Sequence, residues 1–434
     1  MLNFKEICSV SASEKDNFVG LRFEKESSAG QPKPKIIFPK GWSEERIRTV
    51  DEEQLRKDII LLFSAIKRFG SKEQGNLSGS LDGERDVDFP ILSYQYIIHD
   101  FLCNGYYVER EVQYTDGLRG KINWKRTIQK KKPVVSGGNV VYLDFIVKSN
   151  QIKENNLITL IHQYCVKESF DNLGWLYVSG DFSLPTPAIQ FCKPLFVSTL
   201  REALNNTFNE NKRRLFTCML NIVEGKEKDG TSSQTAFGLK KFEVVWEGMI
   251  QAVFGKENTS DYFPHANWYI VKDSQSYRNT SLRPDTIMEH DDKLYILDAK
   301  YYRYGIDENN PDLLPHTADI AKQIVYGKYI QDKKRHKNGT EYENDQIYNA
   351  FIMPFASDDP QKQPYKFVSI GTAEWEKYTA SSPAYCYVLG ILLDTRYLME
   401  QHFSRNEIEV QKLSELIEDS LKNNRIHIDT TSTP

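Results

Sequence analysis

The most constraining feature of the sequence is a hairpin pattern centred on Asp291-Asp292. A two-residue turn at this dipeptide would place Asp285 opposite Asp298, counting outward along the two strands. The run at 294–297, Leu-Tyr-Ile-Leu, is apolar throughout, which is typical of an interior strand. The sequence therefore predicts a buried hairpin at whose open end two carboxylates meet.

The residues that follow this apolar run add two more polar groups. Because side chains alternate along a strand, Lys300 shares a face with Asp298, and the backbone carbonyl of Ala299 lies between them. Two carboxylates so close raise each other's pKa unless a cation lies between them. Hard oxygen ligands with open positions suit Mg²⁺, so we expect Asp285, Asp298 and Ala299 to bind it while Lys300 orients a nucleophile. This set predicts phosphodiester hydrolysis.

An exposed hairpin with ordinary charged residues is the alternative, because pairs spaced like D-x-K are frequent by chance. The apolar run at 294–297 argues against it, since the charges that follow would lie at the end of a buried strand. Pro284, just before the first aspartate, favours a site as well, because its fixed φ sets the start of the strand.

Two polar, Gly-rich stretches, 72–83 and 224–234, divide the chain. With 434 residues, two or three domains are expected. We predict an N-terminal arm and helix over 1–80, a recognition region for DNA or a partner over 81–224, and a catalytic domain over 225–434.

The expected elements alternate between helix and strand, which predicts an α/β fold, α+β overall: a mixed sheet flanked by helices, preceded by an N-terminal α+β region. A capping box at Thr49 and Glu52 predicts a helix that ends at Gly70. Further helices are expected over 92–103, 157–169, 199–223, 242–254 and 318–330, and strands over 106–112, 284–289, 294–302, 347–354, 367–370 and 385–393.

Pro284-Asp285 followed by Asp298-Ala299-Lys300 is similar to the PD-(D/E)xK nuclease motif. The surrounding chain resembles the LlaJI-type restriction endonucleases, relatives of the McrC nuclease subunit of McrBC-type restriction systems. The segments 118–124 and 351–354 also look like family segments. The resemblance implies a C-terminal restriction-endonuclease-like domain that cleaves double-stranded DNA with Mg²⁺, with Asp285 and Asp298 as metal ligands and Lys300 as the catalytic lysine.

Two further positions complete the catalytic set that the resemblance suggests. PD-(D/E)xK enzymes often carry an acidic residue on the helix before the hairpin, and Glu247 is our choice; a solvated helix face is the alternative. Gln323 and Tyr326 resemble the Gln and Tyr of RecB-like and McrC nucleases, although that spacing is usually four residues rather than three. Simple helix packing would also explain this pair.

A basic stretch between positions 119 and 132 contains seven Lys or Arg residues and no acidic one. Such residues, with Trp124 among them, can neutralise DNA phosphates or stack on bases. A partner surface, or a solvated loop or strand edge, is the alternative. The residues predicted to contact nucleic acid are Arg119, Lys121, Lys125, Arg126, Lys130, Lys131 and Lys132.

Several function classes are disfavoured. The sequence has no G-x-x-x-x-G-K-[ST] loop, so in an McrBC-like assembly a separate AAA+ partner must hydrolyse nucleotide. Its His and Cys spacings do not suit a zinc site. Neither a membrane-length apolar run nor a secretion signal is found, so we expect a cytoplasmic protein without a membrane anchor.

Three functional hypotheses remain, of which two are enzymes and one is a non-catalytic protein. The leading one is a restriction endonuclease, for which a homodimer is one arrangement that would cut both strands. The others are a RecB-like DNA repair nuclease and a non-catalytic subunit that binds DNA or activates a partner.

Overall fold

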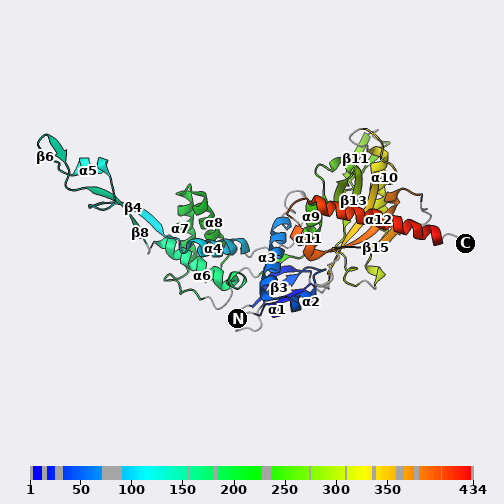
Figure 1. The fold of residues 1–434 in the computed structure, drawn as a ribbon, viewed down its shortest axis with the longest axis horizontal. Helices are drawn as coiled ribbons and strands as arrows, with labels where there is room; N and C mark the ends of the chain where they lie inside the picture. The colour runs from blue at the N-terminus through cyan, green and yellow to red at the C-terminus, as the bar shows by residue number, and fades with distance from the viewer. Residues whose placement is uncertain are drawn as a thin grey trace. The chain divides into compact units, whose positions relative to one another are not determined.

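The computed structural model describes residues 3–11, 17–24, 33–70, 90–153, 156–178, 183–226, 236–272, 275–307, 310–334, 339–357, 366–375, 381–401 and 403–431. The chain forms two compact units (Figure 1). One consists mainly of Asp88–Thr235, and the other combines Asn3–Val87 with Ala236–Pro434. Division at 80 and 224 into three domains stays a prediction. The mixture of helices and mixed sheets confirms the α+β class.

Four helices pack together in the unit of residues 88–235: α4 (Ile91–Asn104), α6 (Leu157–Tyr177), α7 (Lys193–Asn205) and α8 (Glu210–Glu224). The single helix predicted over 199–223 is wrong, because the chain turns between α7 and α8. Asn209 caps α8 by accepting a hydrogen bond from the Lys212 amide, and Arg213 donates to the carbonyls of Leu204 and Thr207. These local bonds fix the break.

The same unit contains a strand-rich segment, residues 109–153. Strands β4 (Glu109–Asp116), β8 (Ile146–Lys153) and β5 (Lys121–Ile122) form one sheet in that order, and β6 (Val134–Ser136) pairs with β7 (Asn139–Val141). Helix α5 (Trp124–Lys130) lies between β5 and β6 in sequence. It is anchored by buried Thr127, whose hydroxyl accepts a hydrogen bond from the Ile146 amide. The predicted basic stretch thus spans β5 and α5.

The second unit begins with a sheet that joins distant parts of the sequence. After α1 (Phe4–Ile7), strands β1 (Cys8–Val10), β3 (Lys33–Phe38), β2 (Val19–Glu24) and β9 (Ala236–Leu239) lie side by side in that order. The antiparallel pairing of β2 with β9 explains why the N-terminal residues belong to the same unit as the C-terminal half.

A five-stranded mixed sheet forms the centre of this unit. Its order is β12 (Thr286–His290), β13 (Lys293–Ala299), β14 (Ile347–Phe355), β16 (Tyr387–Asp394) and β15 (Phe367–Glu374), with parallel pairing from β13 through β14 to β16. Helix α10 (Thr317–Lys333) packs on β13 and β14. Helices α9 (Glu243–Phe254) and α12 (Glu407–Thr431) pack on each other and on β12. The elements predicted here are confirmed to within a few residues.

Smaller elements complete this unit. A separate ribbon consists of β10 (His265–Ile270) and β11 (Gln275–Ser281), and short 3₁₀ turns lie at Ser260–Tyr262, Pro311–Leu313 and Ala384–Cys386. Among the described residues, no helix has both the length and the apolar character needed to cross a membrane.

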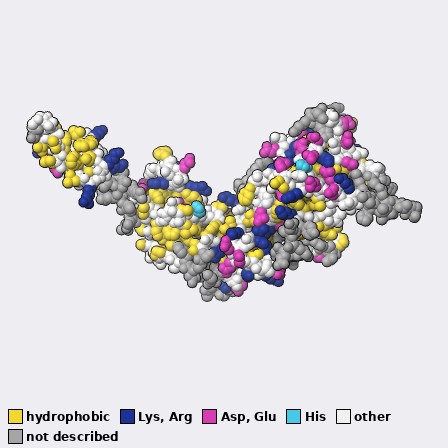
Figure 2. All heavy atoms as spheres, in the orientation of Figure 1, with side chains coloured by type: hydrophobic (Ala, Val, Ile, Leu, Met, Phe, Trp, Pro, Cys, Tyr) yellow, Lys and Arg dark blue, Asp and Glu magenta, His cyan; other side chains and the backbone are white. Residues whose placement is uncertain are grey.

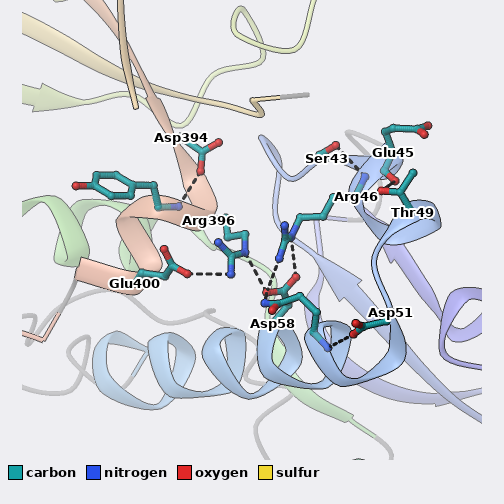
Figure 3. Close-up of polar contacts among 11 residues, drawn as sticks. Ser43, Glu45, Arg46, Thr49, Asp51, Asp58, Asp394, Arg396 and Glu400 are labelled. Carbon is teal, nitrogen blue, oxygen red and sulfur yellow. Dashed lines mark hydrogen bonds and ion pairs between the residues drawn. The ribbon is translucent and has the colours of Figure 1, made fainter. Parts of the chain in front are cut away.

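A buried carboxylate ties the N-terminal helices α2 (Glu44–Thr49) and α3 (Glu52–Phe69) to α11 (Thr395–Gln401) (Figure 3). Asp58 of α3, only 1% exposed, accepts from Arg46 Nε at 2.8 Å and from Arg396 Nε at 3.0 Å. Arg396 also pairs with Glu400 at 2.8 Å. Two guanidinium groups from different ends of the sequence therefore share one desolvated carboxylate.

The start of α3 corrects the predicted capping box. Thr49 belongs to the end of α2, where its hydroxyl donates to the Glu45 carbonyl. Asp51 caps α3 instead, accepting from the Gln54 amide at 2.8 Å. An aspartate caps a helix as well as a threonine does, and Asp51 stands two residues after Thr49.

Candidate active site

The hairpin predicted around Asp291-Asp292 is present with the expected register. His290 lies opposite Lys293, and Thr286 lies opposite Leu297. Asp291 and Asp292 have φ of 47° and 58°, the positive values that a two-residue type I′ turn requires. Continuing the register by one residue places Asp285 opposite Asp298.

The open end of the hairpin brings the motif residues together. The backbone N–H of Ala299 donates to Oδ2 of Asp285 at 2.9 Å. This bond joins the two strands beyond the last backbone pair, Thr286 and Leu297. Asp298 is 2% exposed, and its Oδ2 lies 2.8 Å from Nζ of Lys300. The predicted cluster of two carboxylates and one ammonium group therefore exists as a compact, mostly buried arrangement.

Lys300 has a second partner that the sequence did not predict. Its Nζ also lies 2.8 Å from Oδ1 of Asp319, in the first turn of α10. Burial lowers the pKa of Lys300, but its contacts with Asp298 and Asp319 outweigh burial, so the net pKa is raised and the amine is charged. The position of Asp319, four residues before Gln323 on a predicted helix, was the only sequence signal that pointed to it.

The carboxylates repel one another, as expected for two acids without a cation between them. Burial, followed by the charges of Asp298 and Glu247, raises the pKa of Asp285 to about 7. The Ala299 N–H and the nearby Lys322 oppose this increase. At neutral pH the ionised form of Asp285 is therefore destabilised, and positive charge placed between the acids would relieve it.

Glu247 of α9 belongs to the same electrostatic cluster. Desolvation, followed by Asp298, raises its pKa, although part of its side chain remains exposed. With Ala299, Lys300 and Tyr302 it lines a pocket of about 310 Å³. The residue predicted on the preceding helix therefore lies at the edge of the cluster and faces solvent-accessible space.

Gln323 and Tyr326 lie on the face of α10 that also carries Asp319. Gln323 is 1% exposed, and neither atom of its side-chain amide has a hydrogen-bond partner among the described residues. Tyr326 is fully buried and donates from Oη to the Arg283 carbonyl at 3.0 Å. Asp319 contacts Lys300, and Tyr326 contacts the backbone at residue 283. Gln323 stands between Asp319 and Tyr326 on α10, so its amide lies between these two contacts along the helix.

The donors at this site are oxygen atoms, which fit a hard divalent cation better than zinc. The described residues hold no group of three or more His, Cys, Asp or Glu side chains arranged to bind a metal. The metal ligands predicted from the sequence, however, are only two carboxylates, Asp285 and Asp298, together with the backbone carbonyl of Ala299. Burial and the neighbouring carboxylates raise the pKa of Asp285, and a cation between these acids would oppose that increase.

The basic stretch lies in the other unit and contributes to a surface of mixed character. Six of its seven basic residues are exposed, while Lys131 pairs with Asp116 at 2.7 Å. Figure 2 shows apolar side chains crowded over the part of the chain that carries α5 and β6. The large apolar side chains exposed there are Tyr114, Leu118, Trp124, Ile128, Val134, Val135, Val140, Val141 and Leu143.

Comparison with known proteins supplies the family. Over 379 residues the chain is 26% identical to the type II restriction enzyme BsuMI component YdjA of Bacillus subtilis (strain 168), covering 83% of this chain and 78% of that protein. A chain of the Thermococcus gammatolerans McrBC complex shares 16% identity with a TM-score of 0.21; the match covers 52% of this chain and 63% of that chain, and it is too weak to place any residue. The family model of the LlaJI restriction endonuclease matches residues 33–374, and the chain therefore belongs to the LlaJI restriction endonuclease family.

Proposed function

We propose that this chain is the nuclease of a restriction system and hydrolyses phosphodiester bonds of double-stranded DNA with Mg²⁺. The observation that carries the proposal is the cluster of Asp285, Asp298 and Lys300 at the open end of the β12–β13 hairpin. Family membership supports the restriction role, and the cluster supports the chemistry.

Each residue has a defined task in this proposal. Asp285, Asp298 and the carbonyl of Ala299 would hold Mg²⁺, which supplies positive charge to a phosphate oxygen and lowers the pKa of a bound water. Lys300 is held between Asp298 and Asp319, so its ammonium is charged and fixed beside the reacting phosphate. It orients the attacking water and stabilises the negative charge that develops in the transition state.

The buried Gln323 amide supports a polar occupant of this site. An unpaired buried amide costs free energy unless a ligand or solvent completes its hydrogen bonds. In our proposal it binds the attacking water or a phosphate oxygen. Glu247, on the solvent-accessible side, accepts a proton or helps to hold the ion.

A second role, in partner activation, is favoured for the strand-rich segment 109–153. This segment exposes more apolar side chains than a DNA-contacting surface normally does, because such a surface is polar and basic. We propose that this segment contacts a protein subunit of the restriction system, with an AAA+ nucleotide hydrolase as the candidate. The seven predicted basic residues then lie beside that contact and contribute charge to it or to DNA.

The test of the nuclease proposal uses closed circular plasmid, methylated and unmethylated, with Mg²⁺ and with or without the nucleotide-hydrolysing partner. Linearisation of the circle supports an endonuclease. Degradation of linear DNA with the circle left intact would instead assign the chain to the RecB-like class. If neither substrate is cut under any of these conditions, a non-catalytic role replaces the proposal.

A further inference from the structure

The β10–β11 ribbon is a surface that the catalytic cluster does not use. In the part of the chain that the structure describes, these two strands pair only with each other. Trp268 and Tyr269 of β10 are 67% and 74% exposed, and Val271, just after the strand, is 94% exposed. An isolated two-stranded ribbon with aromatic side chains in water is unfavourable unless something covers it, so it has the character of a contact surface.

The register distributes two kinds of side chain over the two faces. Trp268 lies opposite Tyr277, so both rings project from one face. Asn267 lies opposite Arg278 on the other face, which Tyr269 shares. One face therefore carries the Trp268 and Tyr277 rings, and the other combines the Tyr269 ring with Asn267 and the basic Arg278.

The ribbon leads directly into the candidate active site. Strand β11 ends at Ser281, and four residues further on stands Asp285, a distance of at most about 14 Å for an extended chain. The base of the ribbon is closed by a hydrogen bond from the Leu282 amide to the Pro264 carbonyl at 3.0 Å. The next residue, Arg283, is held by Tyr326 of α10. The base of the ribbon therefore has a fixed position, and its distance of at most about 14 Å from Asp285 corresponds to about four base pairs of DNA at ~3.4 Å per base pair.

The side chains favour DNA as the occupant. Between positions 265 and 283 the sequence contains Lys272, Arg278 and Arg283 but a single acid, Asp273. Basic groups beside aromatic rings suit phosphates and bases. The major groove of B-DNA also admits a two-stranded β-ribbon.

We propose that the β10–β11 ribbon enters the major groove of the DNA duplex beside the scissile phosphate and helps to determine which DNA is cut. This inference rests on the proposed nuclease function, because it assigns the substrate contact of the same site. Arg278 contacts phosphate or a base edge, and the Trp268 and Tyr269 rings pack against the groove.

The test measures duplex binding by fluorescence anisotropy over a range of salt, using the full chain with Lys300→Ala so that the DNA stays intact. In this background, Arg278→Ala and the double variant Trp268→Ala/Tyr269→Ala each reduce affinity at least tenfold. Arg278→Ala also reduces the slope of log K against log salt by roughly 0.9 if it binds phosphate. Matched controls are Phe403→Ala and Ile408→Ala, which are exposed apolar side chains elsewhere in the same unit, and these leave affinity unchanged.

Binding within twofold of the parent in both ribbon variants would overturn the inference, as would a parent chain that binds no duplex. A change in oligomeric state by light scattering, with DNA affinity unchanged, would assign the ribbon to a second copy of the chain and also reject it. Cleavage by the chain with native Lys300 is scored separately. If the chain binds DNA through the ribbon but never cuts it, the nuclease proposal alone is rejected. If the ribbon variants bind and cut DNA normally, the ribbon inference alone is rejected.

Discussion

Replacing Asp285 by Asn should stabilise the protein at alkaline pH while removing a metal ligand. In the folded chain, burial and the neighbouring carboxylates raise the pKa of Asp285 from 3.8 to about 7. The folded state therefore binds this proton more tightly than the unfolded state, so the free energy of unfolding falls as pH rises from about 4 through 7. Asparagine is neutral at every pH and keeps an oxygen that accepts from the Ala299 N–H.

The size of the effect follows from the shift in pKa. A rise of about three units corresponds to roughly 4 kcal/mol at a pH well above 7, because each unit is worth about 1.4 kcal/mol. At pH 8 and without divalent ions, we expect Asp285→Asn to gain about 2–4 kcal/mol over the wild-type chain. At pH 5, where the carboxyl is mostly protonated in the folded chain but ionised in the unfolded chain, the gain should shrink to roughly 1.5 kcal/mol.

Urea unfolding with EDTA, followed by circular dichroism and tryptophan fluorescence at pH 5 and pH 8, measures this difference. Asp312→Asn is the matched control, because Asp312 is an exposed aspartate outside the ion pairs of the cluster. Adding Mg²⁺ should stabilise the wild-type chain at pH 8 but not Asp285→Asn. A variant that is less stable than wild type at pH 8, or a gain that is equal at both pH values, would contradict a raised pKa of Asp285 in the folded chain.

Three other predictions address the rest of the molecule. Asp58→Ala should cost about 3–5 kcal/mol in urea unfolding because it removes the buried carboxylate that two partly buried guanidinium groups share, whereas Glu44→Ala, at an exposed ion pair, should cost less than ~1 kcal/mol. His162 is buried, accepts from the Tyr107 N–H and has a pKa lowered by burial to about 4; protonation of His162 therefore favours unfolding, and the wild-type chain should lose stability relative to the non-titrating His162→Asn variant as the pH falls from 6.5 to 4. Replacing three exposed lysines of the basic stretch by Ala should reduce the slope of log K for DNA against log salt by roughly 0.9 for each phosphate that the chain no longer neutralises. If the slope is unchanged while circular dichroism shows an intact fold, the stretch is assigned to the protein partner. These lysines are Lys125, Lys130 and Lys132.

The hairpin of the candidate site was predictable because its determinants are local. A turn of two aspartates and an adjoining apolar run fix the register, and register alone places Asp285 opposite Asp298. Lys300 follows from side-chain alternation. The same holds for the helices and strands of the central sheet, whose hydrophobic runs are long and clearly bounded.

What the sequence did not predict depends on contacts between distant segments. Asp319 reaches Lys300 only because α10 packs on β13. The pairing of β2 with β9 joins residues more than two hundred positions apart, which no local pattern encodes. The side chains of β10 are exposed along nearly the whole strand, and without a buried face the ribbon's sequence resembles that of a polar loop.

If Lys300 and the two aspartates form a phosphodiester-cleaving centre, as we propose, Lys300→Ala should fail in single-turnover cleavage of plasmid DNA with Mg²⁺. The matched control is Lys328→Ala, an exposed lysine on α10 that pairs only with Asp332 among the described residues. We expect Lys300→Ala to bind DNA nearly as tightly as the wild-type chain and to cut it slower by a factor on the order of 10³, and Lys328→Ala to cut at the normal rate. Cleavage by Lys300→Ala at close to the wild-type rate would contradict the proposed centre.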